Sequence, residues 1–567
     1  MASLTQHAGN LGQRLAAHLL RRLTFAPTKD RIDTVANMTA DAAVDELFNF
    51  QNPSMAQPID PETGQEWIDS GAVEGVNSEQ FKLREFVRAW WMEQAIQDHS
   101  AGHKLTFFLH SIWNTHYEAM GSQFFFDHIR LLRMYAKGNY KQLAEKMTLN
   151  NFMLRYLDNG SNTDDTINEN YAREFLELFT IGKGPQVGPG DYTNYTEHDV
   201  AEATKVLTGF RIDWLRESEN IDPETGIYAG FPKYWGHVVE DKTFSAAFGN
   251  QTITTAELLK RENGSYLYTD ESKEHMEAEM LRELRDFIDM VFNQIETARY
   301  IVRKMYRFFV SSNIDAEIEA DIIQPLATQL SNDNYDLEPT MKRLFKSVHF
   351  FDEDDSVNND EIIGSLIKSP LDLVTGMMSQ LEISSPNPLT DSDNHYNEFY
   401  RRSVFYVMFE NAGFGLFAPP SVAGYPAYYQ APTFHRNWFN SGTIIARFKL
   451  PEMFITGKRV ISWGTLGGVK MDVVQFVKDN IPNNQARQAA QLVAAICQLM
   501  MPEFPDSQRF AYFLDDILMN NLPYFDWRDD WDAYVNDPFD AMKEGAVRAP
   551  LEDLFTAIIY APEYQLM

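Results

Sequence analysis

Apolar residues recur at three- and four-residue steps along most of the chain, which is the spacing of amphipathic helices. Helices are predicted at residues 11–23, 79–98, 104–120, 139–158, 167–181, 196–209, 278–310, 316–331 and 337–347. The last third of the chain continues this pattern. The sequence therefore predicts a mainly α protein, built as a large multi-helical body.

Two stretches depart from the helical pattern. Residues 210–255 mix aromatic and β-branched residues with glycines, as in FPKYWGHVVEDKTFSAAFGNQTI, which is typical of a small β-hairpin or an irregular excursion. Residues 411–442 are rich in Gly, Pro and aromatic residues and predict a long structured loop used for function or for packing. We expect one large helical unit over 1–567. A possible subdivision is 1–185, 186–275 and 276–567.

The stretch INENYAREFLELFTIGKG, residues 167–184, combines a wide apolar arc with unusual polar positions. Its apolar residues cover about half of a helical wheel, so the helix is expected to be well packed. Glu169, Arg173 and Glu177 follow one another at four-residue steps, which predicts a ladder of ion pairs contributing a few tenths of a kcal/mol each. Asn168 falls inside the apolar arc and Glu174 at its edge. Because an unpaired buried amide costs on the order of 1–3 kcal/mol, both side chains need partners, either backbone groups in a structural bracket or a metal or substrate.

A second polar group is predicted on the helix at 196–209. Thr196 precedes Asp199 by three residues, which is the spacing of a capping box. His198 and Glu202 are four residues apart, so with Asp199 they can present metal ligands on one helix face, although this spacing is common by chance. His110 and His116 are six residues apart. On one helix they would be separated by about 240° and could not share a metal.

Composition narrows the possible functions. The formal charge is 49 − 81 = −32 and no run of basic residues stands out, so nucleic-acid binding is not expected. The single cysteine, Cys497, permits no intrachain disulfide. Without an 18-residue apolar run or an N-terminal apolar segment, we expect no membrane span, no leader and a cytoplasmic location, with export by another route as the alternative. Motifs of P-loop enzymes, serine hydrolases and zinc peptidases are absent from the sequence.

Several segments, taken in order, resemble one bacterial family, the domain of unknown function numbered 1800. They are AAHLLRRLTFAPT (16–28), FFLHSIWNTHYEAM (107–120), LRYLDNGSNTDDTINENYAREFLELFTIGKG (154–184), YTEHDVAEATKVLTGF (195–210), HVVEDKTFSAAFG (237–249), TARYIVRKMYRFFV (297–310), FAPPSVAGYPAYYQ (417–430) and WFNSGTIIARF (438–448). The resemblance runs nearly end to end, and the NENxARExxELxTxG segment is quite specific. It implies a mainly helical protein that is often encoded beside a sulfatase-like protein.

By position, the resemblance identifies the polar motif residues as Asn168, Glu169, Asn170, Arg173, Glu174, Glu177, His116, Asp199, His237, Asp241 and Lys242. The family commonly shows W-H-N-H-F, where this chain reads Trp113-Asn114-Thr115-His116-Tyr117. Asn114 thus replaces the first histidine, which weakens a two-histidine metal clamp.

These observations lead to the hypothesis of a metal-assisted hydrolase or transferase with a polar pocket among the helices at 104–120, 167–181 and 196–209. The predicted catalytic residues are Glu174, Glu177, Arg173 and His116, with Arg173 as an anion clamp. The predicted substrate contacts are Asn168, Asn170 and Lys242, and the predicted divalent-metal ligands are His198, Asp199 and Glu202. His198 is also a candidate acid or base.

Two non-enzymatic alternatives use the aromatic loop at 411–442. In the first, the protein is a scaffold or assembly partner for a sulfatase-like protein and this loop is the contact surface, which requires exposed Tyr and Trp side chains. In the second, the same aromatic side chains bind a carbohydrate or another polymer.

Overall fold

The computed structural model describes residues 2–51, 56–61, 63–69, 77–255, 270–354, 362–455, 457 and 469–567. The mainly α fold predicted from the sequence is confirmed. The first half of the chain contains α1 (Gly12–Leu23), α2 (Lys29–Val35), α3 (Ala40–Phe48), α4 (Asn77–Gln97), α5 (Gly102–Ile112), α6 (Ser122–Met134), α7 (Tyr140–Thr148), α8 (Asn151–Tyr156), α9 (Asn170–Glu174), α10 (Glu197–Val206) and α11 (Asp270–Phe292).

The second half contains α12 (Ile295–Phe309), α13 (Ala316–Ile318), α14 (Gln324–Asn332), α15 (Leu337–Phe345), α16 (Pro370–Gln380), α17 (Pro426–Tyr429), α18 (Thr443–Ile455), α19 (Val473–Asn480), α20 (Asn483–Ala486), α21 (Ala489–Met500), α22 (Ser507–Ala511), α23 (Tyr524–Asn536) and α24 (Ala541–Tyr560). The π-helices are η2 (Phe175–Phe179), η7 (Glu319–Ile323), η8 (Asn394–Glu410) and η10 (Tyr512–Leu518). The short 3-10 helices are η1 (Asn159–Ser161), η3 (Ser218–Asn220), η4 (Tyr234–Gly236), η5 (Ala246–Phe248), η9 (Phe434–Trp438) and η11 (Pro562–Gln565).

Two small antiparallel sheets lie in the predicted excursion at 210–255. Strand β1 (Phe210–Arg211) pairs with β2 (Phe231–Pro232), and β3 (Lys242–Thr243) pairs with β4 (Thr252–Ile253). Each pair has two residues per strand, so these sheets brace loops and do not form a layer of their own. The expectation of a small β excursion is confirmed.

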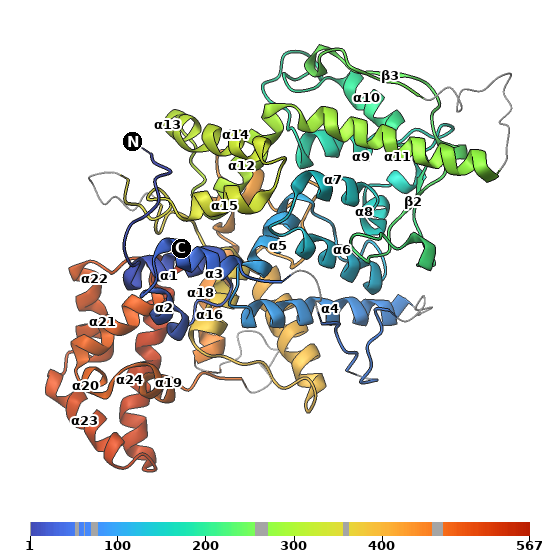
Figure 1. Cartoon of the computed structure of the whole chain (residues 1–567). Coiled ribbons are helices and arrows are strands. Elements are labelled where there is room, and N and C mark those ends of the chain that lie inside the picture. Colours follow the sequence, from blue (N-terminus) through green and yellow to red (C-terminus); the bar gives the residue numbers. More distant parts are fainter. Residues whose placement is uncertain are drawn as a thin grey trace.

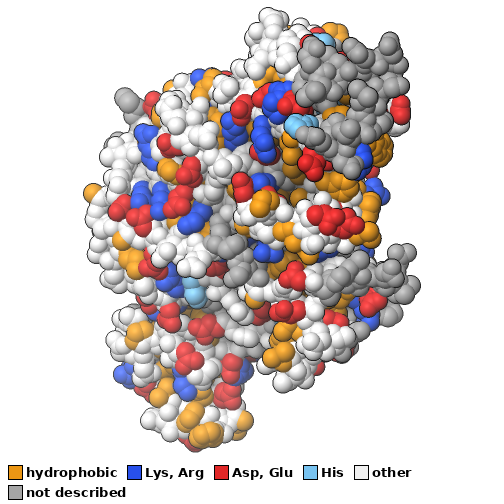
Figure 2. Space-filling view, turned by 45° about the vertical axis from the view of Figure 1, so that its right-hand side comes forward, with side chains coloured by type: hydrophobic (Ala, Val, Ile, Leu, Met, Phe, Trp, Pro, Cys, Tyr) orange, Lys and Arg blue, Asp and Glu red, His pale blue; other side chains and the backbone are white. Residues whose placement is uncertain are grey.

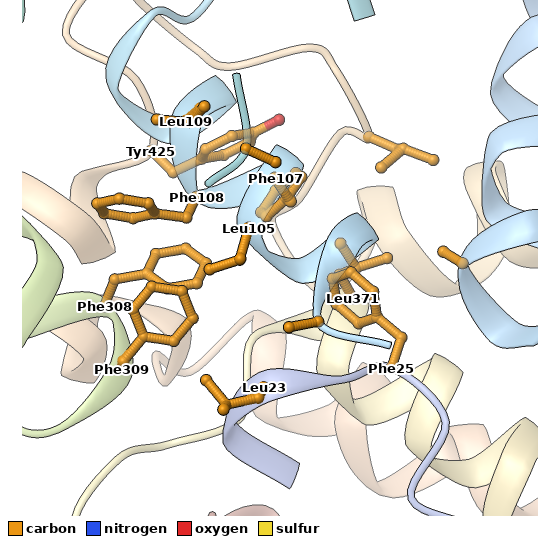
Figure 3. Packing of buried hydrophobic residues seen from close by; sticks show 14 of the residues in the cluster. Leu23, Phe25, Leu105, Phe107, Phe108, Leu109, Phe308, Phe309, Leu371 and Tyr425 are labelled. Carbon is orange, nitrogen blue, oxygen red and sulfur yellow. The ribbon is translucent and has the colours of Figure 1, made fainter. Parts of the chain in front are cut away.

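The helices surround one continuous cluster of buried apolar side chains that runs in sequence from Leu11 to Tyr564. The cluster has members in all three stretches of the possible subdivision, 1–185, 186–275 and 276–567. In Figure 1, α9, α10 and α11 lie at one end of the molecule and α19–α24 at the other, while the C-terminal end lies beside α1. Figure 3 shows part of the cluster, where side chains of α5 and α12 meet Leu23 and Tyr425.

Several helices begin where a side-chain oxygen accepts a hydrogen bond from the first turn, which satisfies an otherwise unpaired backbone N–H. Ser369 does this for α16, Asp540 for α24 and Thr196 for α10. At α10 the side chain of Asp199 returns a bond to Thr196, so the predicted capping box is confirmed.

The predicted helices at 139–158 and 278–310 are each divided in two, into α7 and α8 and into α11 and α12. Two further helix boundaries, both near predicted site residues, are wrong. Helix α5 ends at Ile112, so His116 lies in a turn beyond it and shares no helix with His110. Helix α9 begins only at Asn170, because the Asn168 side-chain oxygen accepts a hydrogen bond from the Asn170 backbone N–H at 3.0 Å and forms a turn there. Asn168 therefore does not point into an apolar arc, and Ile167, the first apolar residue of this stretch, is 49% exposed.

Half of the Phe, Tyr and Trp side chains of the loop at 411–442 are buried in the core. Phe414, Phe417, Tyr425 and Trp438 are at most 4% exposed, and the Tyr425 hydroxyl donates a hydrogen bond to the Gly415 carbonyl at 2.7 Å. Tyr429 of the same loop is exposed, with a relative solvent-accessible surface of 38%. The buried rings are unavailable to a partner protein or a carbohydrate, so they serve packing.

Charged side chains of both signs are interspersed on the face shown in Figure 2. Within the described residues, none of the helices has the length and apolar character needed to cross a bilayer.

Candidate functional site

Glu174 and Glu177 lie where α9 passes into the π-helix η2. Glu174 is the last residue of α9, and Glu177 is in the middle of η2. The apolar side of η2 is anchored in the core, where the ring of Phe179 stacks on Trp113 with centroids 4.5 Å apart. Because single π-helical turns are frequent at functional sites, this junction is a place to examine for chemistry.

The charge of Glu177 is compensated by its neighbours. Its Oε1 lies 2.5 Å from the Lys183 Nζ, and its Oε2 accepts a hydrogen bond from the Tyr195 hydroxyl at 3.4 Å. The Tyr300 hydroxyl, from α12, donates to the backbone carbonyl of Glu177 at 3.1 Å. These contacts fix the position of Glu177 from three separate segments of the chain.

Glu174 has a different environment three residues earlier. Its side chain is half-buried, and among the residues that the structure describes it has no hydrogen-bond or ion-pair partner. Burial raises the pKa of Glu174 to about 7, and the negative charge of Glu177 adds to this effect, while Arg173 and Lys183 oppose it. One carboxyl of the pair is therefore held by partners, and the other is poised to exchange a proton near neutral pH.

Gly182 allows α12 to approach this pair. Its φ is +71°, and a Cβ atom there would lie 2.6 Å from the Tyr300 ring. Glycine therefore meets two requirements at once, a left-handed backbone and close contact with an aromatic side chain. The Gly182 carbonyl also accepts a hydrogen bond from the Asn194 side chain at 3.0 Å, which ties the end of η2 to the following loop.

Arg173 is engaged on the outer side of α9. Its Nη1 and Nη2 donate to the two carboxylate oxygens of Glu197 at 2.7 Å each, and Nη2 also donates to Glu169 at 3.1 Å. The predicted ion pair between Glu169 and Arg173 is present. The predicted pair between Arg173 and Glu177 is replaced by two others, Arg173 with Glu197 of α10 and Glu177 with Lys183. A substrate anion would have to compete with Glu197 for this guanidinium.

Asn168 and Asn170 brace the turn before α9. The Asn168 backbone N–H donates to the Asn162 side chain at 3.0 Å, and the Asn170 side chain donates to the Leu157 carbonyl at 3.4 Å. Together with the hydrogen bond from the Asn170 backbone N–H to the Asn168 side chain, these contacts form a structural bracket. Such a bracket was one of the two alternatives for Asn168 in the sequence analysis. They leave the turn well determined just before Glu174.

The three predicted metal ligands each have a local hydrogen-bond partner. His198 Nε2 lies 2.8 Å from the Thr243 carbonyl oxygen, and Glu202 accepts from the Thr243 backbone N–H at 3.1 Å. Asp199 accepts from the backbone N–H and the hydroxyl of Ser245, both at 2.7 Å, besides capping α10. These residues attach α10 to β3. In the described part of the chain, no three His, Cys, Asp or Glu side chains gather into a group that could hold a metal ion.

His116 lies in another environment, beyond the end of α5. The His116 ring is stacked on Tyr117 with centroids 5.2 Å apart, and its Nδ1 accepts from the Glu118 backbone N–H at 3.3 Å. Burial lowers the pKa of His116. Among the described residues, no hydrogen bond, ion pair or ring contact joins His116 to Glu174 or His198. Glu174, Glu177 and Arg173 thus share the α9–η2 segment, which is tied to α10 through the Arg173–Glu197 pair, whereas His116 has no such contact with this segment among the described residues.

Lys242 belongs to a buried network around Glu283 of α11. Lys242 and Glu283 are both 0% exposed, and their charged groups approach to 2.5 Å. The Lys242 Nζ also donates to the Val238 carbonyl at 2.8 Å and to the Thr255 hydroxyl at 3.1 Å, and His237 Nε2 lies 3.1 Å from Glu283. Every donor of the ammonium group is therefore used within the protein, which indicates a structural role.

The comparison with protein families covers nearly the whole chain. A family described as protein of unknown function (DUF1800) matches residues 18–566. The chain belongs to this family. The resemblance inferred from the sequence segments is thereby confirmed. No curated protein and no solved structure matches the chain.

Sequence reasoning missed the partners that define the site of this DUF1800 protein. Lys183, Tyr195 and Tyr300 hold Glu177, and Glu283 holds Lys242. Lys183 and Tyr195 lie within or beside segments that carry the family resemblance, which was a usable signal for them. Glu283 lies outside those segments, on a helix with many other acidic residues, and gave no such signal.

Proposed function

We propose that this DUF1800 protein is a hydrolase or group-transfer enzyme, with Glu174 as its general acid and base and Glu177 as the neighbouring fixed negative charge. The observation that carries the proposal is the contrast within the pair: Glu174 has a pKa raised to about 7 and no partner among the described residues, whereas Glu177 is held by Lys183 and Tyr195. A carboxyl group whose pKa is raised by burial, beside a second carboxylate that is held by cationic and hydroxyl partners, is typical of acid–base catalysis.

The chemistry follows from these protonation states. A protonated Glu174 donates its proton to the leaving-group oxygen as the bond to that oxygen breaks, and the resulting carboxylate then accepts a proton from the attacking water or acceptor hydroxyl. Burial, with the negative charge of Glu177 as a second cause, keeps the pKa of Glu174 high enough for the first step. After both steps Glu174 is protonated again, so the cycle is balanced.

A divalent cation held by Glu174 together with substrate and water oxygens is a second element of the proposal. Mg²⁺ is commonly held by one or two carboxylates together with water and substrate oxygens. The oxygens of Glu174 are the donors open to it, and a bound cation would lower the pKa of Glu174, so proton and metal compete for this side chain. The metal would then activate the water that Glu174 otherwise deprotonates.

The test uses chromogenic p-nitrophenyl substrates of four classes, namely phosphate monoester, sulfate ester, carboxyl ester and glycoside, each from pH 5 to pH 9 with and without Mg²⁺ or Mn²⁺. For any substrate that is turned over, Glu174→Gln is expected to lower kcat about 10²- to 10⁴-fold, the usual contribution of general acid–base catalysis, and to remove an ionisation near pH 7. Glu169→Gln, at an exposed carboxylate of the same segment, is the matched control and should retain activity. Equal activity of Glu174→Gln and wild type, with the same pH profile, would exclude Glu174 from catalysis.

A further inference from the structure

A second feature lies where the N-terminal segment meets α12, α13 and the turn after α15. A cavity of about 550 Å³ lies there, and this volume is typical of small-molecule sites. In Figure 1 the N-terminal end is beside α13, and the Ala2 backbone N–H donates to the Glu317 side chain of that helix at 2.7 Å. The described residues that line this cavity do not include Glu174 or Glu177.

Three side chains of the cavity wall form one hydrogen-bonded chain. The Tyr306 hydroxyl lies 3.0 Å from His349 Nε2, and His349 Nδ1 lies 2.7 Å from Asp354 Oδ2. Tyr306 belongs to α12, whereas His349 and Asp354 follow the end of α15. All three residues line the cavity. A phenol, an imidazole and a carboxyl group from two elements therefore meet at a space that a small molecule can occupy.

The positions of these three side chains are well determined. The rings of Tyr306 and His349 are stacked with centroids 5.8 Å apart and 16° between their planes, and the two residues are 1% and 4% exposed. Asp354 also accepts a hydrogen bond from the Ser3 backbone N–H at 2.9 Å, and the His349 backbone N–H donates to the Ser3 carbonyl at 3.2 Å. The N-terminal segment thus fixes both the imidazole and its carboxylate, which preorganises the chain of hydrogen bonds.

The charge of Asp354 sets the direction of these hydrogen bonds. Burial acts to raise the pKa of Asp354, but the hydrogen bond and the charge of His349 bring it below the ordinary value, so Asp354 is a carboxylate at neutral pH. Because a carboxylate only accepts, His349 Nδ1 carries a hydrogen. In the neutral imidazole Nε2 is then the acceptor, and the Tyr306 hydroxyl donates to it. This is the arrangement of nucleophile, base and orienting carboxylate, with tyrosine as the hydroxyl residue.

The other lining residues determine which charge a ligand should carry. Asp315 and Glu317 line the cavity together with Asp354, and the described lining residues include no lysine or arginine. Three carboxylates repel a phosphate or sulfate ester and attract an ammonium group. Ser311 and Asn313 add neutral polar groups to the same wall. The cavity is therefore suited to a small polar cation.

We propose that this cavity is a second reactive centre, at which Tyr306 is the nucleophile toward small acyl esters that carry an ammonium group. Tyr306 Oη attacks the ester carbonyl carbon while its proton passes to His349 Nε2. The bond to the leaving alcohol then breaks, and the alcohol oxygen takes that proton from His349. Water next attacks the acyl–tyrosine ester and gives its proton through His349 to Tyr306 Oη, which restores the phenol and releases the acid. Asp354 stabilises the imidazolium that forms in each step.

Sulfonyl fluorides test the nucleophile independently of the natural ester. The phenolic oxygen bonds to sulfur, the S–F bond breaks, fluoride leaves, and the phenol proton goes to His349. The full chain is treated with aminoethylbenzenesulfonyl fluoride, which carries an ammonium group, and with neutral benzenesulfonyl fluoride. Peptide mass spectrometry then gives the rate of labelling at each tyrosine. Tyr406, which is 61% exposed, reports the reactivity of an ordinary tyrosine in the same molecule.

We expect the cationic reagent to label Tyr306 at least about tenfold faster than Tyr406, because general-base assistance contributes about 10²- to 10⁴-fold to a reaction. His349→Gln and Asp354→Asn should each slow the labelling of Tyr306 at least about tenfold and leave that of Tyr406 unchanged. Melting temperatures identify a variant that does not fold. The ratio of the two rates in wild type needs no variant, so it tests the proposal in any case.

The two reagents together test the acidic wall. Normalised to Tyr406, Tyr306 should react at least about tenfold faster with the cationic reagent than with the neutral one. The double variant Asp315→Asn and Glu317→Gln should remove most of this preference, and asparagine keeps the N-cap of α13. Asp321→Asn is the matched control, because Asp321 lies on η7 outside the cavity lining, and it should keep the preference.

Three results would overturn the proposal. The first is labelling of Tyr306 that is no faster than labelling of Tyr406, which is the behaviour of a buried phenol with a structural role only. The second is a folded His349→Gln variant that is labelled at Tyr306 as fast as wild type. The third is an equal normalised rate for the two reagents, which would remove the ammonium group from the description of the substrate.

Discussion

Buried charged side chains have different sets of partners in two regions of the protein, around Glu283 and around Arg21. In the first, Lys242 donates to Glu283, Val238 and Thr255, so its ammonium group has a partner for each of its donors. In the second, Arg21 donates from Nη2 to the Leu499 carbonyl at 2.8 Å, and its other two nitrogens have no acceptor among the described residues. Both regions are nearly inaccessible to solvent, so burial alone does not distinguish them.

The difference lies in what remains unpaired and in whether there is room beside it. A buried ion that lacks a partner costs several kcal/mol, so a fold keeps one only where something else stabilises it. The network around Glu283 is complete within the protein. The hydrogen bonding of Arg21 is incomplete among the described residues, and Arg21 lines a small cavity together with Lys368 and Gln380. The Glu174–Glu177 pair repeats this contrast with acidic groups, because Glu177 has partners and Glu174 has none among the described residues.

The largest expected effect comes from breaking the complete network. Glu283→Gln leaves Lys242 buried without a counter-charge, so it should lower the free energy of unfolding by about 3–5 kcal/mol, measured by urea denaturation. Glu279→Gln is the control on the same helix, because it removes a partly exposed pair with Arg282 and should cost less than about 1 kcal/mol. Similar losses in the two variants would mean that the Glu283 network contributes no more than a surface pair.

The local parts of this architecture could be predicted from the sequence. Helical periodicity gave most of the helices, and the Thr196–Asp199 spacing gave the cap of α10, because both depend on residues close together in the chain. The start of α9 was misplaced because the Asn168 side chain competes with the helix for backbone hydrogen bonds. The end of α5 at Ile112 was also missed, and with it the position of His116.

The charge clusters could not be predicted because their members are far apart in sequence. Lys242 and Glu283 are separated by 41 positions, and the small cavity joins Arg21 to Lys368 and Gln380. Periodicity places each of these residues on an element, but it does not say which elements meet. The sequence singled out Glu174 by its position at the edge of an apolar arc, and that residue does have an unusual environment, although Asn168, chosen by the same reasoning, does not.

A smaller effect on the free energy of unfolding tests whether the environment of Glu174 destabilises its charged form. Its folded-state pKa of about 7 lies above the ordinary value of 4.5, so the folded protein holds the proton more tightly than the unfolded chain. The stability of wild type should therefore fall as the pH rises from about 4.5 to about 7. Allowing for partial solvent screening, Glu174→Gln should be more stable than wild type by about 1–2 kcal/mol at pH 8, and the gain should vanish near pH 4.5.

Urea denaturation at a series of pH values measures this difference, with Glu169→Gln as the control that should show no gain at pH 8. A Glu174→Gln variant that is less stable than wild type at pH 8 would mean that the carboxylate is satisfied by contacts of its own. The unpaired member of the comparison would then be Arg21 alone.

The smallest effect on the free energy of unfolding is expected for an ion pair that is fully formed but exposed to solvent. Arg173 is bound by both oxygens of Glu197, yet their side chains are 32% and 44% exposed. Glu197→Gln should lower the free energy of unfolding by only about 0.3–1 kcal/mol, and most of that loss should disappear in 1 M NaCl, because salt screens exposed pairs. The buried Glu283→Gln variant should keep its larger loss in the same salt. If both variants respond equally to salt, the network around Glu283 is accessible to water, and completeness of pairing would no longer separate it from the surface.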